Sequence, residues 1–172
     1  RVVLFDKTFA PLIAAVKAHL PHVEHFICLD AADDAITEKI ADVKFYDDLV
    51  SKESEQFTWP SFDEQTASSL CYTSGTTGNP KGVLYSHRST ILHSFAISLP
   101  DSLNLSANDI MLPVVPMFHV NAWGTPYAAA MVGCTVVLPG PGLDGPSLVN
   151  MIDTYKVTVA LGVPTIWQGL LA

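Results

Sequence analysis

The stretch CYTSGTTGNPKGVLYSHRS, residues 71–89, gathers hydroxyl side chains, glycines and a lysine into one short segment. All ten glycines of the chain lie at or after Gly75, so tight turns and close backbone approaches belong to the second part of the chain. The glycines free the backbone N–H groups, and the hydroxyls and the Lys81 ammonium donate to negative charge. We therefore expect this loop to bind an oxyanion, phosphate above all, and to join two strands, the second of which includes residues 83–85.

Helical and β-rich segments alternate before the loop. Residues 2–5 and 23–29 are predicted strands, and between them a helix begins near Thr8 and ends at Pro21. Strand, helix and strand in this order predict a parallel βαβ unit. Residues 51–66 are polar and without periodicity, which predicts a surface connector within one domain.

The alternation continues after the loop. Ser86 is predicted to cap a helix that ends before Pro100, with an apolar face formed by Ile91, Leu92, Phe95 and Leu99. Further predicted strands are residues 110–112, 135–138 and 157–161, and further predicted helices are residues 127–132, a helix capped by Asp144 and a last helix beginning at Pro164. The helix after Asp144 carries an apolar stripe of Leu148, Met151, Ile152 and Tyr155. Residues 113–116 are expected to form a proline-rich turn. The alternation predicts an α/β fold, a three-layer αβα arrangement around a mostly parallel sheet, with ligands beyond the carboxyl ends of the strands.

Composition excludes several classes of function. The chain of 172 residues has a formal net charge of −8 and 49% hydrophobic residues, which is typical of a globular protein and unsuited to nucleic acid or to an anionic membrane surface. No apolar run is long enough to span a bilayer, and residues 1–20 lack the layout of a signal peptide. Cys28, Cys71 and Cys134 are odd in number and far apart, which favours reduced thiols in a cytoplasmic protein.

The sequence gives less support to a metal site at the histidines and to other phosphate motifs or a flexible linker at the loop. His19, His22 and His25 suggest a metal site, but Pro21 breaks the helix that would align them, so we interpret them as surface histidines. The loop contains no GxGxxG, and Gly82 follows Lys81 where GxxxxGK[ST] requires a hydroxyl. A flexible Ser/Thr/Gly linker remains an alternative, although such linkers do not usually carry Pro-Lys-Gly between two β-rich runs.

The sequence YTSGTTGNPKG, residues 72–82, resembles the signature loop of the AMP-forming adenylate-forming enzymes, which include acyl-CoA synthetases, luciferases and peptide-synthetase adenylation domains. The resemblance implies a Rossmann-like subdomain, ATP and Mg²⁺ as cofactors, and attack of a carboxylate on the α-phosphorus of ATP with loss of pyrophosphate. It implies that the loop holds the pyrophosphate oxygens through Thr73, Ser74, Gly75, Thr76, Thr77, Gly78 and Lys81. Among these, it implies that Thr73 lies nearest the metal and that Thr76 and Lys81 act in catalysis.

A second stretch, PMFHVNAW at residues 116–123, is similar to a signature of acyl-CoA synthetases that borders the acyl and adenylate site. The resemblance implies a catalytic role for His119 and places Val120 and Trp123 near the acyl channel. Relatives that activate amino acids carry an aspartate in place of His119, so an ammonium group here would lack its partner. The whole stretch most resembles medium- or long-chain fatty-acid–CoA ligases.

The resemblance extends from RVVLFD at the start to VTVALGVPTIW near the end. It implies an internal fragment of a large N-terminal AMP-binding domain, with residues 1–70 as a βαβ portion and connector and residues 71–172 as the phosphate-loop and acyl-pocket portion. It also implies that the C-terminal domain lies outside these residues, so we expect the fragment to be inactive alone. In the longer enzyme the implied substrates are a fatty acid, ATP and CoA. The oligomeric state stays open, and a homodimer is one alternative. The alternatives are an aryl- or short-acyl-CoA ligase and a noncatalytic nucleotide-binding scaffold.

Overall fold

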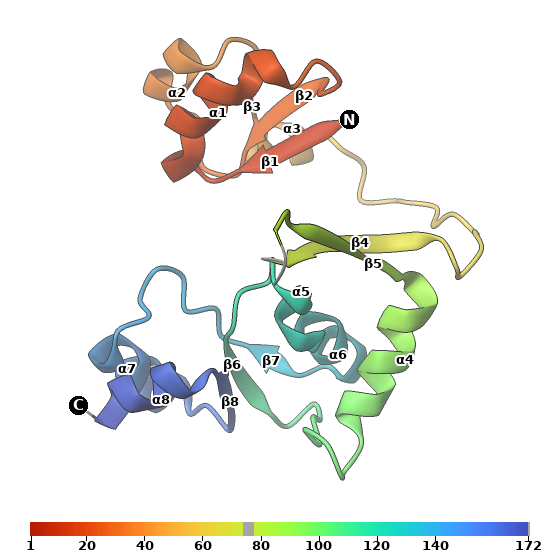
Figure 1. Ribbon diagram of the computed structural model, residues 1–172, viewed down its shortest axis with the longest axis vertical. Coiled ribbons are helices and arrows are strands. Elements are labelled where there is room, and N and C mark those ends of the chain that lie inside the picture. The colour runs from red at the N-terminus through yellow and green to blue at the C-terminus, as the bar shows by residue number, and fades with distance from the viewer. Residues whose placement is uncertain (74–77, 172) are drawn as a thin grey trace. The chain divides into compact units, whose positions relative to one another are not determined.

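The computed structural model describes residues 1–73 and 78–171 (Figure 1). The chain divides into two compact units, Arg1–Pro60 and Ser61–Ala172. The division falls inside residues 51–66, which contain no helix or strand and are exposed. This segment is the predicted surface connector, but it joins two compact units instead of lying within one.

The first unit is a small parallel α/β unit. Its sheet has the order β1-β2-β3 and consists of β1 (Val2–Phe5), β2 (His25–Cys28) and β3 (Lys44–Phe45). Its helices are α1 (Ala10–Val16), α2 (Asp34–Lys39) and α3 (Tyr46–Val50), and 3₁₀ turns at Lys7–Phe9 and Lys17–His19 extend α1 at both ends. The predicted parallel βαβ unit is therefore confirmed. Alternate residues of β1 and β2 point into a core of Phe5, Ala10, Ile13, Phe26, Cys28, Ile36 and Ile40.

The start of the first helical segment differs from the prediction. Asp6, not Thr8, caps it, because the Asp6 carboxylate accepts a hydrogen bond from the backbone N–H of Thr8 at 2.8 Å. A carboxylate oxygen reaches the free N–H groups of a first turn as well as a hydroxyl does. His19, His22 and His25 are exposed, as predicted, and all three cysteines of the chain are free thiols.

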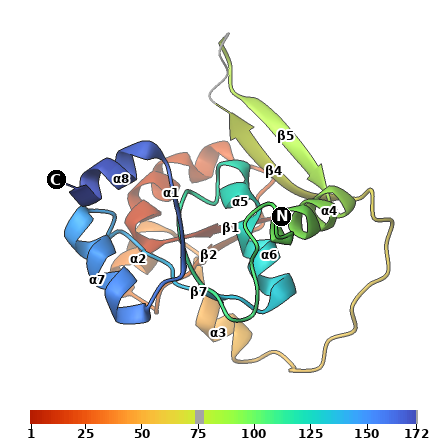
Figure 2. The same ribbon diagram turned by 90° about the horizontal axis from the view of Figure 1, so that it is seen from below.

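The second unit holds an antiparallel hairpin and a parallel sheet. The hairpin pairs β4 (Ala67–Thr73) with β5 (Lys81–Ser86), and the sheet has the order β7-β6-β8, from β6 (Ile110–Val114), β7 (Thr135–Val136) and β8 (Val159–Gly162). The helices are α4 (His87–Ser98), α5 (Val120–Trp123), α6 (Thr125–Val132), α7 (Gly145–Tyr155) and α8 (Pro164–Leu171). Strand β5 runs directly into α4, and α7 and α8 lie side by side (Figures 1 and 2).

Strand β6 is the centre of a three-layer arrangement. Met111 packs on one face with Ala128 and Ala129 of α6, while Leu112 and Val114 pack on the other face with α7 and α8. The predicted α/β class with mostly parallel strands is confirmed. In the described residues the strands are divided between two parallel sheets and one antiparallel hairpin, where we had expected a single sheet.

The predicted turn at residues 113–116 is wrong at its first residue. Pro113 does not begin a turn, because β6 continues through it and places it opposite Leu161 of β8. Strand β7 pairs with β6 only at Ile110 and Met111, so in the described residues one edge of β6 is unpaired at Pro113, where a missing N–H is tolerated.

The apolar face predicted for α4 does not face the core. Its four residues are each at least half exposed, and the fully buried residue of the helix is Ser94. Helix α4 packs against α6 (Figure 1), and the hydroxyls of Ser94 and Ser98 donate to the carbonyls of Thr90 and Ser94, each at 2.8 Å. Serine can be buried there because its own helix satisfies it and its small side chain lets the helices approach. No helix among the described residues is long and apolar enough to cross a membrane.

Candidate functional site

The hairpin β4–β5 carries the predicted phosphate loop. Thr73, the last residue of β4, is opposite Lys81, the first residue of β5, and the Thr73 hydroxyl donates to the Lys81 carbonyl at 3.4 Å. The Lys81 side chain is exposed. Gly78 has a φ of 128°, which side-chain-bearing residues rarely adopt. Ser74, Gly75, Thr76 and Thr77 lie outside the described residues.

The second motif forms a left-handed turn. The consecutive residues Val120, Asn121, Ala122 and Trp123 have φ values of 50°, 49°, 48° and 58°, and Gly124 follows with 71°. Within the turn, the N–H of Ala122 donates to the carbonyl of His119 at 3.0 Å. A left-handed conformation costs about 1–2 kcal/mol for each residue with a side chain. Such a run persists only where the surrounding structure holds it.

Side chains from three elements hold this left-handed turn, residues 120–124. The Asn121 amide donates to the Ser69 hydroxyl of β4 at 2.9 Å and accepts from the Cys71 thiol at 3.2 Å. The Nε2 atom of His93 on α4 lies 3.0 Å from the Trp123 carbonyl oxygen, and the Thr125 hydroxyl donates to the Ala122 carbonyl at 2.7 Å. The turn is therefore fixed to the hairpin, to α4 and to the start of α6.

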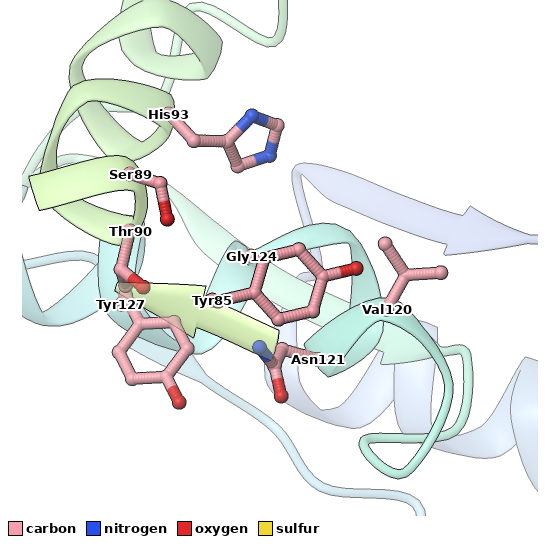
Figure 3. Close-up of a pocket in the computed structure, with 8 residues that line it drawn as sticks. All are labelled: Tyr85, Ser89, Thr90, His93, Val120, Asn121, Gly124 and Tyr127. Carbon is pink, nitrogen blue, oxygen red and sulfur yellow. The ribbon is translucent and has the colours of Figure 1, made fainter. Parts of the chain in front are cut away.

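A cavity of about 390 Å³ lies beside the turn (Figure 3). It is lined by Tyr85 of β5, by Ser89, Thr90 and His93 of α4, by Val120, Asn121 and Gly124 of the turn, and by Tyr127 of α6. A Cβ atom at Gly124 would lie 2.5 Å from Cδ2 of His93, so the position requires glycine for space as well as for its positive φ. Among the described residues that line the cavity, none has an acidic side chain.

A second cavity, of about 530 Å³, lies at the carboxyl end of β6 and is lined by the first residues of the motif. Its lining residues are Pro113, Val114, Val115, Pro116, Met117, Phe118, Leu138, Pro139, Gly140 and Leu143. The motif at residues 116–123 thus contributes to the walls of two cavities, one with polar groups and one formed by apolar side chains and glycine. Both lie in the second unit.

The predicted site residues are only partly brought together. Val120 lines the first cavity, whereas His119 and Trp123 line neither cavity in the described part of the chain. Sequence reasoning missed Asn121, which joins the second motif to β4. The signal for it was an asparagine shortly before a glycine, because both residues tolerate a positive φ better than others do.

Thr73 is the residue on which a metal contact was predicted. Its hydroxyl supplies one hard oxygen, and no group of three or more histidine, cysteine, aspartate or glutamate side chains able to hold a metal occurs in residues 1–73 and 78–171. Mg²⁺ in nucleotide sites keeps several waters and takes most other ligands from the phosphates. One hydroxyl therefore fits the way Mg²⁺ is usually bound beside ATP.

Comparisons with known proteins match the whole chain to one family and to ligases of that kind. The family model described as "AMP-binding enzyme" matches residues 1–172. The chain is 60% identical to a 3-methylmercaptopropionyl-CoA ligase of Ruegeria lacuscaerulensis and 58% identical to a medium-chain-fatty-acid–CoA ligase of Ectopseudomonas oleovorans, in each case over 100% of this chain and 32% of the relative. The chain thus spans about a third of the length of these relatives.

A solved structure confirms the fold. The crystal structure of an anthranilate CoA ligase in complex with anthranoyl-AMP superposes with a TM-score of 0.79 at 22% identity, over 99% of this chain and 32% of that one.

Proposed function

The chain belongs to the AMP-binding enzyme family, and on that premise we propose that the protein of which it is part is an ATP-dependent acyl-CoA ligase acting on an acid with an uncharged, apolar chain. One observation carries this proposal. The hydrogen bonds of Asn121 to Ser69 and Cys71 hold the turn beside the cavity against the strand that leads into the phosphate loop. An adenylating enzyme needs this proximity, because it must bring a carboxylate to the α-phosphorus of ATP.

The phosphate loop has the donor types that the first half-reaction requires. A carboxylate oxygen forms a bond to the α-phosphorus while the bond from that phosphorus to the pyrophosphate oxygen breaks, so charge builds on the pyrophosphate. Hydroxyls of Ser74, Thr76 and Thr77, backbone N–H groups and the Lys81 ammonium stabilise that charge. Thr73 contributes one oxygen to Mg²⁺, which supplies charge neutralisation when bound.

The left-handed turn supplies the acyl side of the site. In this proposal the cavity that Val120 lines receives the acyl chain, Trp123 of the same turn stands near it without lining it, and His119 borders the reacting carboxylate. Support comes from the lining of the cavity by Val120 and by the rings of Tyr85 and Tyr127. An amino acid would leave its ammonium group without an acidic partner there, which is unfavourable.

The relatives narrow the class of acid. Two ligases of nearly equal identity are named for 3-methylmercaptopropionate and for medium-chain fatty acids, and both acids carry an uncharged flexible chain. We propose a medium- or long-chain fatty acid as the substrate, with CoA as the acceptor of the acyl group. An aryl or short-chain acid is the second candidate, and of these two the short-chain acid is favoured by the name of the relative that is 60% identical.

The direct test is ATP–pyrophosphate exchange by the full-length protein with octanoate, 3-methylmercaptopropionate, benzoate and alanine as the acids. We expect exchange with octanoate, none with alanine, and thioester formation when CoA is added. A higher kcat/KM with 3-methylmercaptopropionate or benzoate would favour the second candidate. ATP binding with no acid-dependent exchange would establish a noncatalytic scaffold, and exchange by residues 1–172 alone would contradict the proposal that this fragment is inactive.

Substitution of the loop tests the role of its hydroxyls. Thr76→Ala is expected to lower kcat about a hundredfold, by analogy with the loss of one oxyanion donor. Thr66→Ala is the matched control, because Thr66 is an exposed residue just before β4. Equal activity of the two variants would contradict the role of Thr76.

A further inference from the structure

Asn121 contacts both halves of the proposed site. Its side chain lines the cavity, and the same amide bonds Ser69 and Cys71 on β4. Ser69 and Cys71 are two residues apart, so they face the same side of the strand, and the strand ends at Thr73, where the phosphate loop begins.

The backbone conformation of Asn121 allows its side chain to connect the cavity wall to β4. Its φ of 49° and ψ of 44° lie in the left-handed region, where asparagine is several-fold enriched over other side-chain-bearing residues. The left-handed turn therefore presents an amide toward β4. Both parts of that amide are used, since the nitrogen donates to a hydroxyl and the oxygen accepts from a thiol.

We propose that Asn121 is a positioning residue that sets the phosphate-loop strand against the wall of the acyl cavity. This inference rests on the proposed function. The residue touches no reacting atom in this scheme, and it acts by fixing the distance between the element that holds the acid and the element that holds ATP.

The expected consequence is a loss in kcat more than in KM. Each substrate keeps its own contacts when the bridge is removed, so each binds nearly as well. The carboxylate and the α-phosphorus are then held less accurately, and a displacement of about 1 Å can cost a hundredfold in rate. Because His93 and Thr125 still hold the turn when the Asn121 side chain is removed, the displacement should be smaller than this, and so should the loss in kcat.

The test uses Asn121→Gly and Ser69→Ala in the full-length protein. Glycine adopts the same positive φ without strain, so the first variant removes the side chain and leaves the turn. We expect kcat for octanoate-dependent exchange to fall about tenfold in each variant, with KM for ATP and octanoate changed less than threefold. The double variant should fall no further than Asn121→Gly alone, because Asn121→Gly already removes the bond that Ser69→Ala removes.

Ser68→Ala is the matched control, because Ser68 lies on the same strand but bonds Tyr85 and Thr90 and makes no bond to the left-handed turn. It should keep kcat within about twofold. Losses that multiply in the double variant, a change confined to KM, or a lowered melting temperature with normal kcat would each overturn the positioning role.

A readout independent of activity separates this inference from the proposed function. Amide hydrogen exchange of residues 69–73 should become faster in Asn121→Gly and in Ser69→Ala, because β4 loses its contact with the turn. Unchanged exchange overturns the inference even if the protein is a ligase. A wild-type protein without acid-dependent exchange overturns the proposed function, while the protection of residues 69–73 still decides whether Asn121 holds the strand.

Discussion

Helices α4 and α7 both begin with a side-chain N-cap, but α4 buries a polar residue, Ser94, whereas α7 buries an apolar one, Leu148. Ser86 caps α4 through a capping box with Ser89, and Asp144 caps α7 through the N–H of Ser147. Each helix carries an apolar stripe, but the stripe of α7 packs on the sheet through Leu148, whereas that of α4 is exposed. Capping and periodicity therefore identify a helix without identifying its buried face.

The neighbour decides which face is buried. Helix α7 covers a sheet whose side chains leave room for Leu148, Met151 and Ile152. Helix α4 packs on α6, where Ala128 and Ala129 are almost fully buried, and small residues on both helices permit close approach. The inner side of α4 also supplies Thr90 and His93 to the cavity, so its polar side serves the site.

The largest effect that tests this contrast is expected from Leu148→Ala. Leu148 is 1% exposed, and its truncation should lower the free energy of unfolding by about 3 kcal/mol through lost burial and the cavity left behind. Leu92→Ala in α4 removes the same atoms from a side chain that is 53% exposed and should cost less than about 0.5 kcal/mol. Urea denaturation measures both values. Equal losses would contradict the finding that Leu92 lies on an exposed face of α4.

The converse substitution is Ser94→Leu. Ser94 is 1% exposed, so a larger side chain must force α4 and α6 apart, and we expect a loss of about 1–3 kcal/mol. Asn150→Leu on the exposed side of α7 is the matched control and should change stability by less than about 0.5 kcal/mol. If Ser94→Leu stabilised the protein instead, the interface between α4 and α6 would have room that the structure does not show.

The same contrast explains what could be predicted from the sequence. Strand β1, the helix cap at Asp144 and the start of α8 at Pro164 follow from local chemistry, and the structure confirms them. The buried side of α4 and the strand position of Pro113 depend on which element lies alongside, and no local pattern reports that. Propensity and periodicity describe a segment, while burial describes a pair of segments.

The candidate site shows the same limit. Residue types and the resemblance predict that the phosphate loop and the second motif are sites, and the role of each residue in them stays a prediction. Nothing in Val120 or Ala122 indicates a left-handed turn, because their side chains disfavour it. The turn is held by contacts of Asn121 with Ser69 and of His93 with Trp123, which join segments far apart in the sequence.

A smaller effect is expected from the cap of α4. The Ser86 hydroxyl accepts from the N–H of Ser89 at 3.1 Å, and the Ser89 hydroxyl accepts from the N–H of Ser86 at 3.0 Å. Ser86→Ala should lower the free energy of unfolding by about 1 kcal/mol. Ser86→Asp, which restores an acceptor, should recover most of that loss. Failure of the aspartate to recover it would show that the cap is not the source of the effect.

The smallest expected effect is a pH dependence of stability, which distinguishes the Asp144 cap of α7 from the Ser86 cap of α4. Hydrogen bonds from the Ser147 hydroxyl, at 2.7 Å, and from its backbone N–H, at 3.0 Å, hold the pKa of Asp144 below its ordinary value of 3.8. A lowered folded-state pKa means that the carboxylate stabilises the fold above the ordinary value and that this contribution is lost as the pH falls through the lowered pKa. The difference in melting temperature between the wild type and Asp144→Ala should therefore shrink from about pH 7 to about pH 3, whereas the corresponding difference for Ser86→Ala should not change, because serine does not titrate there.

Asp144→Asn keeps an acceptor without a charge and should itself show no such dependence. If the Asp144→Ala difference were the same at both ends of this range, the carboxylate would not be the group that caps α7.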